Sequence, residues 1–294
     1  MDELQMPTVS AVIVTLNAEA YIGNLLAKIQ GQTVKPCEIL VMDSESEDNT
    51  AGICREYGVE PIRIRRNDFN HGGTRDYALR LCKGDYVLML TQDAIPADNC
   101  LIEKMALSLK QNERMAACYG RQMPREDATY MEGLIREYNY PEQSHVYSCE
   151  DIPTHGIKTF FMSDVCAMYK KEAYLSIGGF EKDIKTNEDM LFAARAIQSG
   201  YSIGYAADAR VIHSHNLSLS EQYKRNYIQG YEIERHKDLL TAKSQNSEGM
   251  KLVKHVSKQM LSKGKVFSWI YFGCDCVARY AGSYMGKLTY RRSE

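Results

Sequence analysis

An acidic residue, Asp93, stands at the end of a strand-like apolar run in the segment "LMLTQDAIPADN", residues 88–99. A carboxylate in this position could hold a divalent cation against a phosphate, because hard cations take oxygen ligands and neutralise a diphosphate leaving group. A carboxylate before Pro96 could also cap a loop or the following helix. Asp98 is equally suited to cap that helix, which weakens the capping interpretation for Asp93.

Further polar residues stand at the points where other predicted strands end. They are Thr15, Asn17, Asp43, Ser44, Ser46, His71, Gly72, Gly73, Thr91 and Gln92. Groups of this kind are able to bind a nucleotide. The two familiar phosphate-binding loops are missing, since no G-x-G-x-x-G follows the first strand and "GSYMGK" from residue 282 has too short a glycine spacing for a Walker loop. A dinucleotide-binding oxidoreductase and a P-loop kinase are therefore disfavoured.

The elements that must position these residues alternate along the chain. Apolar runs predict strands at residues 9–14, 38–43, 60–66 and 85–90, and amphipathic segments predict helices at 18–32, 48–58, 74–84 and 98–111. The loop "NDFNHGGT" opens the third helix. This alternation predicts an α/β fold, a Rossmann-like and mostly parallel sheet with helices on both faces. Ligands of such sheets bind at the carboxyl ends of the strands, where the polar residues fall.

Composition indicates a globular chain with one large domain or two smaller ones. Of the 294 residues, 44% are apolar and 25% are charged, which disfavours disorder and a coiled coil. The start "MDELQMPT" is acidic, and no run reaches the roughly 18 to 20 apolar residues that cross a bilayer. The nine cysteines are odd in number and include no C-x-x-C pair, which suits a reducing compartment. We therefore expect a cytoplasmic protein.

The C-terminal segment differs in charge from the rest. Residues 251–294 carry nine Lys or Arg against two acids, a balance of +7 that leaves −9 for the remainder of the chain. The segment is also aromatic, as in "VFSWIYFGC". These features are typical of a helix on the inner, anionic face of a membrane, or of a packed helical pair with a solvated basic face. Nucleic-acid binding is disfavoured by the acidic overall balance and the lack of a recognition motif.

Five ordered segments carry a resemblance to a known family. They are "VIVTLNAEAYIGNLL", "ILVMDSESEDNT", "HGGTRDYALRLCKGDYVLMLTQDAIP", "IGGF" and "NEDMLFAARAIQSGY". Together they resemble family 2 glycosyltransferases of the GT-A fold over roughly residues 8–216. The forms D-S-x-S-x-D, H-G-G-T-R, T-Q-D-A and "VIHSHN" resemble the rhamnosyltransferase branch. The resemblance implies a transferase domain at 1–216 with an acceptor-side insertion at 124–159, followed by a helical extension at 217–294.

The resemblance also implies a site for a nucleotide-sugar donor. Its residues would be Thr15, Asn17, Asp43, His71, Gly72, Gly73, Arg75, Gln92 and Asp93. Asp93 matches the last acid of the family's D-x-D motif, whereas Thr91 replaces the first acid, so a cation cannot be held by two acids there. His213 and His215 follow a strand-like run and could complete a site for Mg²⁺ or Mn²⁺ with Asp93. Each could equally be a hydrogen-bonded loop histidine.

The catalytic base is expected at the start of the helix in "TNEDMLFAARAIQSGY". Glu188 and Asp189 could simply be acids favoured by the helix dipole. The resemblance implies instead that Asp189 takes a proton from the acceptor hydroxyl during a single displacement with inversion, through a transition state of oxocarbenium character. Glu188 and the segment Gly178, Gly179 and Phe180 would lie on the acceptor side, although a plain turn explains these glycines equally well.

Three functions are compatible with these residues. The first is transfer of L-rhamnose from dTDP-L-rhamnose to a glycan or lipid-linked acceptor in surface polysaccharide synthesis. The second is transfer from another nucleotide sugar, with UDP or GDP. The third is a non-catalytic nucleotide-sugar-binding subunit, suggested by Thr91 and opposed by the presence of Asp93, Glu188 and Asp189.

Overall fold

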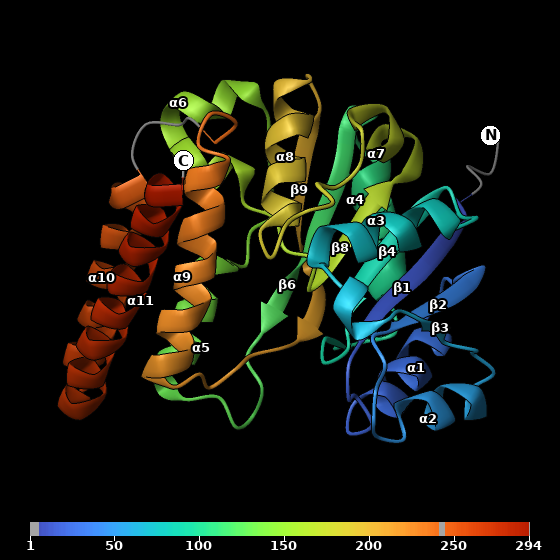
Figure 1. Ribbon diagram of the computed structural model, residues 1–294, viewed down its shortest axis with the longest axis horizontal. Helices are drawn as coiled ribbons and strands as arrows, with labels where there is room; N and C mark the ends of the chain where they lie inside the picture. Colours follow the sequence, from blue (N-terminus) through green and yellow to red (C-terminus); the bar gives the residue numbers. More distant parts are fainter. Residues whose placement is uncertain (1–5, 241–244, 294) are drawn as a thin grey trace.

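The computed structural model describes residues 6–240 and 245–293 of the chain. A central β-sheet carries helices on both faces, and three C-terminal helices stand at one end of the longest axis (Figure 1). The first strands lie toward the opposite end (Figure 1).

The sheet gathers most strand ends at one edge. The strands are β1 Val9–Thr15, β2 Glu38–Asp43, β3 Ile62–Arg63, β4 Tyr86–Thr91, β5 Ile95–Pro96, β6 Met115–Met123, β7 His145–Tyr147, β8 Cys166–Lys170 and β9 Ser202–Ile212. Their order is β3-β2-β1-β4-β8-β6-β9-β5, with β7 also beside β9. Strands β1 to β4 are parallel. Because β8 is antiparallel to both β4 and β6, β6 and its parallel neighbour β9 run in the same direction as β4.

Helices pack on both faces because successive side chains of a strand point to opposite sides. The helices are α1 Ile22–Gln30, α2 Thr50–Glu56, α3 His71–Leu81, α4 Leu101–Lys110, α5 Tyr130–Asn139, α6 Ile152–His155, α7 Lys171–Ile177, α8 Glu188–Gln198, α9 Leu219–Arg235, α10 Gln245–Ser262 and α11 Val266–Ser293. In β1, Ala11 and Ile13 join the hydrophobic core under α1 and α4. Val12 joins the core under α3, α7 and α8. The predicted α/β class is confirmed.

The start of α3 differs from the prediction. His71, Gly72 and Gly73 form its first turn rather than a loop, and the Asn70 side chain caps that turn by accepting a hydrogen bond from Gly73 N–H. A Cβ atom on Gly72 would lie 1.8 Å from the Glu181 carbonyl oxygen. The glycine therefore permits close packing of α3 against the segment before α8.

Three other differences concern strands. Strand β6 was not predicted, although its side chains are almost all buried. The strand predicted at 60–66 shortens to β3, and β8 is a further strand outside the predicted set. The expected insertion at 124–159 contains α5, α6 and the edge strand β7, which pairs with β9. The domain boundary near residue 216 stays a prediction.

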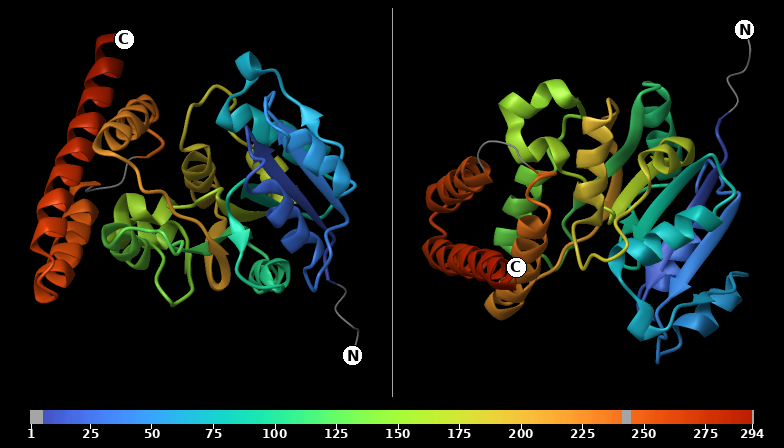
Figure 2. Two further views of the ribbon diagram at one scale, coloured as in Figure 1. Left: turned by 90° about the horizontal axis from the view of Figure 1, so that it is seen from below. Right: turned by 45° about the horizontal axis from the view of Figure 1, so that its top comes forward.

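The C-terminal helices pack through glycine. Figure 2 shows α11 alongside α9. A Cβ on Gly230 of α9 would lie 2.2 Å from the Ser283 carbonyl oxygen of α11, and one on Gly282 would lie 2.3 Å from the Tyr223 carbonyl oxygen. The two backbones are therefore in contact. Within residues 6–240 and 245–293, no helix has both the length and the hydropathy to cross a membrane.

Candidate active site

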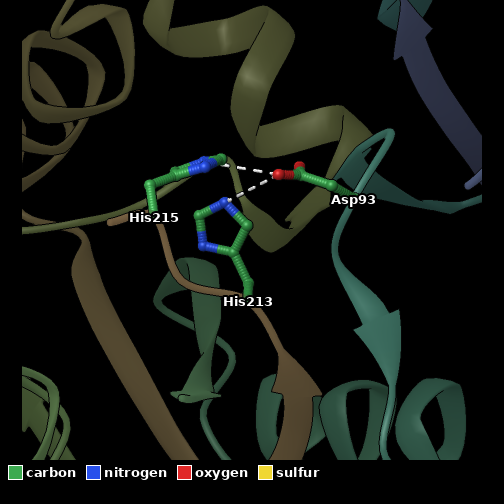
Figure 3. A group of neighbouring side chains, drawn as sticks. All are labelled: Asp93, His213 and His215. Carbon is green, nitrogen blue, oxygen red and sulfur yellow. Dashed lines mark ion pairs between the residues drawn. The ribbon is translucent and has the colours of Figure 1, made fainter. Parts of the chain in front are cut away.

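Asp93, His213 and His215 converge on one point beyond the ends of β4 and β9 (Figure 3). The Asp93 Oδ2 atom lies 3.5 Å from His213 Nε2 and 3.3 Å from His215 Nε2. The three ligand-type atoms lie within 4.8 Å of one another. They are brought together because β9 runs parallel to β4, so both chain segments leave the sheet at the same edge.

A hydrogen bond to the Nδ1 atom of His213 orients its other ring nitrogen, Nε2, toward Asp93. Its Nδ1 atom lies 3.0 Å from Gln122 Oε1. The Gln122 amide nitrogen donates to Ser163 Oγ over 2.9 Å, and Arg136 donates to Gln122 Oε1. With Oε1 as acceptor, His213 carries its proton on Nδ1 and presents the Nε2 lone pair toward Asp93. Burial lowers the pKa of His213 to about 3, so the ring is neutral at pH 7.

These donors fit a divalent cation. One carboxylate oxygen and two imidazole nitrogens form a mixed donor set, and a histidine ligand is normally oriented by a hydrogen bond to its other nitrogen, as Gln122 does for His213. Thr91 lines a cavity that Asp93, His213 and His215 also line. Its hydroxyl oxygen is buried and has no hydrogen-bond partner among the residues that the structure describes.

Asp189 is held at the first turn of α8 by two backbone groups. Its Oδ2 accepts a hydrogen bond of 3.0 Å from Asp164 N–H, and its Oδ1 accepts one of 2.7 Å from Met190 N–H. Burial, followed by the charge of Glu188, raises the pKa of Asp189 to about 7. The two hydrogen bonds and the Arg75 charge oppose that rise. A carboxylate with such a pKa is suited to general base catalysis near neutral pH.

Arg75 neutralises part of a buried acidic cluster behind Asp189. Its guanidinium lies 3.1 Å from Glu188 Oε1 and 3.5 Å from Asp164 Oδ2. Asp164 is only 3% exposed, and Tyr169 donates a hydrogen bond to it. Burial and the neighbouring Asp189 raise the pKa of Asp164 well above its ordinary value. The predicted ligand-binding residue Arg75 thus already has two carboxylate partners.

A cavity of about 690 Å³ joins the two clusters. Asp93, His213 and His215 lie in its wall together with Asp189, and its far side is formed by α9. The predicted residues His71, Arg75 and Glu188 also line it. A charged cluster able to hold a cation and a carboxylate able to accept a proton therefore face one open cavity.

The residues predicted for the nucleotide lie at the neighbouring strand ends. Asp43 borders a separate cavity of about 1060 Å³ and accepts a hydrogen bond of 3.1 Å from the Thr15 hydroxyl. Asn17 adopts a left-handed conformation with φ 50°, and its Oδ1 accepts from Glu47 N–H. The Gln92 side-chain amide accepts a hydrogen bond from Leu16 N–H and donates one to the Leu16 carbonyl oxygen. These side chains tie together the loops after β1, β2 and β4, and their contacts with a donor stay predictions.

The structure does not bring the segment 178–180 into either of these cavities. Gly178 ends α7 in the left-handed conformation. A Cβ on Gly179 would lie 2.3 Å from Asp76 Oδ1, and the Phe180 ring packs among core aromatic residues such as Tyr174 and Phe192. The turn interpretation accounts for this segment. In the same way, Gly72 and Gly73 have packing and capping roles that need no ligand.

Sequence reasoning missed three residues of the site. Asp164 precedes β8, whose reversed direction puts its beginning at the ligand edge. Gln122 lies on the unpredicted strand β6. Arg225 lies on α9 and lines the cavity from the C-terminal side. The local sequence around a polar residue before a strand or on a long helix does not indicate that the residue belongs to a site. Only the strand order and the helix packing show its position near the site.

Comparison with known proteins assigns the chain to a family. A family model described as glycosyl transferase family 2 matches residues 10–178. The chain belongs to glycosyl transferase family 2, and the GT-A resemblance noted in the sequence is confirmed.

Two curated relatives match over most of the chain. The chain is 38% identical to the O-antigen chain rhamnosyltransferase WbaN of Salmonella anatum over 227 residues, which are 76% of this chain and 72% of the relative. It is 37% identical to the O-antigen chain rhamnosyltransferase RfbN of Salmonella typhimurium, over 76% of this chain and 71% of the relative. Among solved structures, the mannosyltransferase PcManGT from Pyrobaculum calidifontis, in complex with GDP-Man and Mn2+, matches with a TM-score of 0.67. That match has 16% identity and covers 97% of this chain and 88% of the other, and it shows a shared fold.

Proposed function

We propose that the protein is an inverting, metal-dependent rhamnosyltransferase that moves L-rhamnose from dTDP-L-rhamnose to a glycan or lipid-linked acceptor in surface polysaccharide synthesis. The observation that carries the proposal is the shared cavity, in which Asp189 faces the same space as Asp93, His213 and His215. The identity of 38% and 37% with two O-antigen rhamnosyltransferases supports the choice of rhamnose.

The cation would be held by Asp93, His213 and His215. When bound, it supplies positive charge that stabilises the departing nucleoside diphosphate. Two imidazole nitrogens beside one carboxylate favour Mn²⁺ over Mg²⁺, since Mg²⁺ binds oxygen ligands and keeps its waters.

Asp189 is the proposed general base. Its carboxylate takes the proton from an acceptor hydroxyl while that oxygen forms a bond to the anomeric carbon of the donor sugar. The bond from that carbon to the diphosphate oxygen breaks, and dTDP leaves with the electron pair. Attack opposite the leaving group inverts the anomeric configuration. Asp164 N–H and Met190 N–H keep the carboxylate oriented throughout.

The donor nucleoside would extend toward the cavity at Asp43, with Thr15, Asn17 and Gln92 holding the surrounding loops in place. The acceptor would enter on the side of α8 and α9, next to Glu188. These assignments follow from the order of the strand ends along the edge of the sheet.

We also infer that α11 binds peripherally to an anionic membrane that carries the acceptor. Phe267 is 90% exposed and Tyr280 is 71% exposed, and Trp269 and Ile270 are partly exposed on the same helix. Exposed aromatic side chains near basic ones are typical of interfacial helices. Co-sedimentation with vesicles of anionic and of neutral lipid tests this, with the double variant Phe267→Ser and Ile270→Ser. Equal binding of variant and wild type would contradict it.

A donor screen tests the proposed reaction. Nucleoside diphosphate release is measured from dTDP-rhamnose and from UDP- and GDP-sugars, with and without a chelator, for the wild type and Asp189→Asn. We expect chelator-sensitive turnover of dTDP-rhamnose, lost in the variant, and a product of inverted configuration by NMR. Turnover of another donor alone would overturn the choice of rhamnose. Retained turnover in Asp189→Asn would overturn the assignment of the base.

A further inference from the structure

Helix α9 contributes one stripe of side chains to the active-site cavity. Arg225, Ile228, Gln229 and Ile233 line the cavity, at the three- and four-residue spacing that puts side chains on one face of a helix. Arg225 is the charged member of this stripe. It therefore projects toward the space that also contains Asp93, His213 and Asp189.

Arg225 has no ion-pair partner among the residues that the structure describes, whereas its arginine neighbours do. Arg136 pairs with Glu132 over 2.6 Å, and Arg279 pairs with Asp275 over 2.6 Å. Glu132 and Asp275 are thus each paired with another arginine. The three arginines exceed these two carboxylates by one positive charge, and among the described residues Arg225 is the arginine of the three without a carboxylate partner.

The surroundings of Arg225 disfavour an isolated cation. Arg225 is an exposed residue that borders the cavity. Burial, and then the charges of Arg136 and Arg279, lower the pKa of its guanidinium. An anion in the cavity would relieve this unfavourable charge.

We propose that Arg225 is a phosphate-binding residue of the active site, supplied by the C-terminal helices across the cavity from Asp93. The inference rests on the proposed glycosyl transfer. A guanidinium binds phosphate oxygens through two parallel hydrogen bonds, and this geometry makes arginine especially effective for phosphate. The phosphate belongs to the diphosphate of the donor or to a phosphate of a lipid-linked acceptor.

Arg225→Gln and Arg225→Lys test the proposal, with Lys224→Gln as the matched control. Lys224 precedes Arg225 on α9, is exposed and does not line the cavity. Calorimetry with Mn²⁺ measures binding of dTDP and of inorganic pyrophosphate. Kinetics compare a lipid-phosphate-linked acceptor with a neutral alkyl glycoside of the same glycan.

We expect Arg225→Gln to weaken one phosphate interaction by about 10- to 100-fold, with Arg225→Lys intermediate and Lys224→Gln unchanged. Weaker binding of dTDP and pyrophosphate assigns Arg225 to the donor. A raised KM for the lipid-phosphate acceptor alone, with normal dTDP binding, assigns it to the acceptor. Values within about twofold of the wild type in all assays overturn the proposal.

The pyrophosphate assay keeps this test separate from the proposed donor. If the wild type does not use dTDP-rhamnose, the choice of rhamnose fails, yet the effect of Arg225→Gln on pyrophosphate binding still supports or overturns a phosphate site on the donor side. Circular dichroism of each variant confirms that the fold is retained.

Discussion

The backbone N–H of Asp164 donates a hydrogen bond to the Asp189 carboxylate, with 3.0 Å between the nitrogen and Oδ2. The Asp164 side chain points instead toward Arg75 and Tyr169. One residue therefore orients the proposed base through its backbone and adds a buried acid behind it through its side chain. The Asp164 N–H thus orients Asp189 and opposes the rise of its pKa, which comes from burial and from the charge of Glu188.

Replacement of Asp189 by Asn should remove the base without disturbing donor binding. The amide cannot accept the acceptor proton, so we expect kcat to fall by about 10²- to 10⁴-fold. Nucleoside diphosphate release measures kcat, and calorimetry measures dTDP binding. Asp183→Asn is the matched control, because that side chain is 92% exposed on the segment before α8. A similar loss in both variants would contradict a specific role for Asp189.

Activity should rise with pH through the pKa of Asp189. The base acts only when deprotonated, and its pKa is raised to about 7. The value of kcat/KM should therefore fall about tenfold for each pH unit below about 7 and reach a plateau above it. The profile is measured at saturating Mn²⁺. A flat profile between about pH 5.5 and pH 8.5 would show that another group controls the reaction.

Arg75→Gln should destabilise the fold by about 3 to 5 kcal/mol at about pH 8, because it leaves buried carboxylates without their cation. Burial raises the pKa of Asp164 and Asp189, so the folded chain binds these protons more tightly than the unfolded chain does. Stability therefore falls as pH rises from their ordinary pKa toward the raised values, and more steeply in the variant.

Urea unfolding at about pH 5 and about pH 8 measures the difference in the free energy of unfolding. Arg55→Gln is the control, since Arg55 forms an exposed pair with Glu60, and exposed ion pairs contribute little to stability. A loss for Arg75→Gln that is equal at both pH values would argue against the acidic cluster as its cause.

Gln122→Leu should weaken Mn²⁺ binding by about 10- to 100-fold, although Gln122 is not itself a proposed ligand. The change removes the acceptor that fixes the proton of His213 on Nδ1. Calorimetric titration with Mn²⁺ measures the affinity. Gln143→Leu, at an exposed position, is the control. Unchanged affinity in Gln122→Leu would mean that His213 does not bind the cation.

Gly72→Ala should lower the free energy of unfolding by about 1 to 3 kcal/mol, because its Cβ would overlap the Glu181 carbonyl oxygen. Gly133→Ala, within helix α5, is the matched control. A Cβ there meets nothing within 4 Å, so this change should stabilise α5 by about 0.5 to 1 kcal/mol. Urea unfolding measures the free energy of unfolding of both variants. Equal changes for Gly72→Ala and Gly133→Ala would contradict the packing role of Gly72.

The parallel part of the fold could be predicted from the sequence because each of its strands is a local apolar run followed by polar residues. Strand β2 ends at its predicted residue, β1 and β4 each end one residue later than predicted, and Asp93 lies at the predicted edge. Strand β6 escaped prediction because "MAACYGRQM" mixes small and polar residues. Its burial comes from pairing with β8 and β9, which are distant in sequence.

The site could be predicted only in part, for a related reason. The convergence of His213 and His215 on Asp93 agrees with the prediction that they share one site. The position of Asp164 depends on the reversal of β8, and that of Arg225 depends on how α9 crosses the cavity. Neither is encoded in a spacing along the chain.

The contact between α9 and α11 has a mechanical consequence. At Gly230 and Gly282 the two backbones touch with no side-chain layer between them, and closely packed interiors transmit strain rather than absorb it. A displacement of α11 would therefore move α9, and with it the cavity wall that carries Arg225. Helix α11 would therefore be mechanically coupled to the candidate active site, although it lies outside the sheet that supports the proposed catalytic residues.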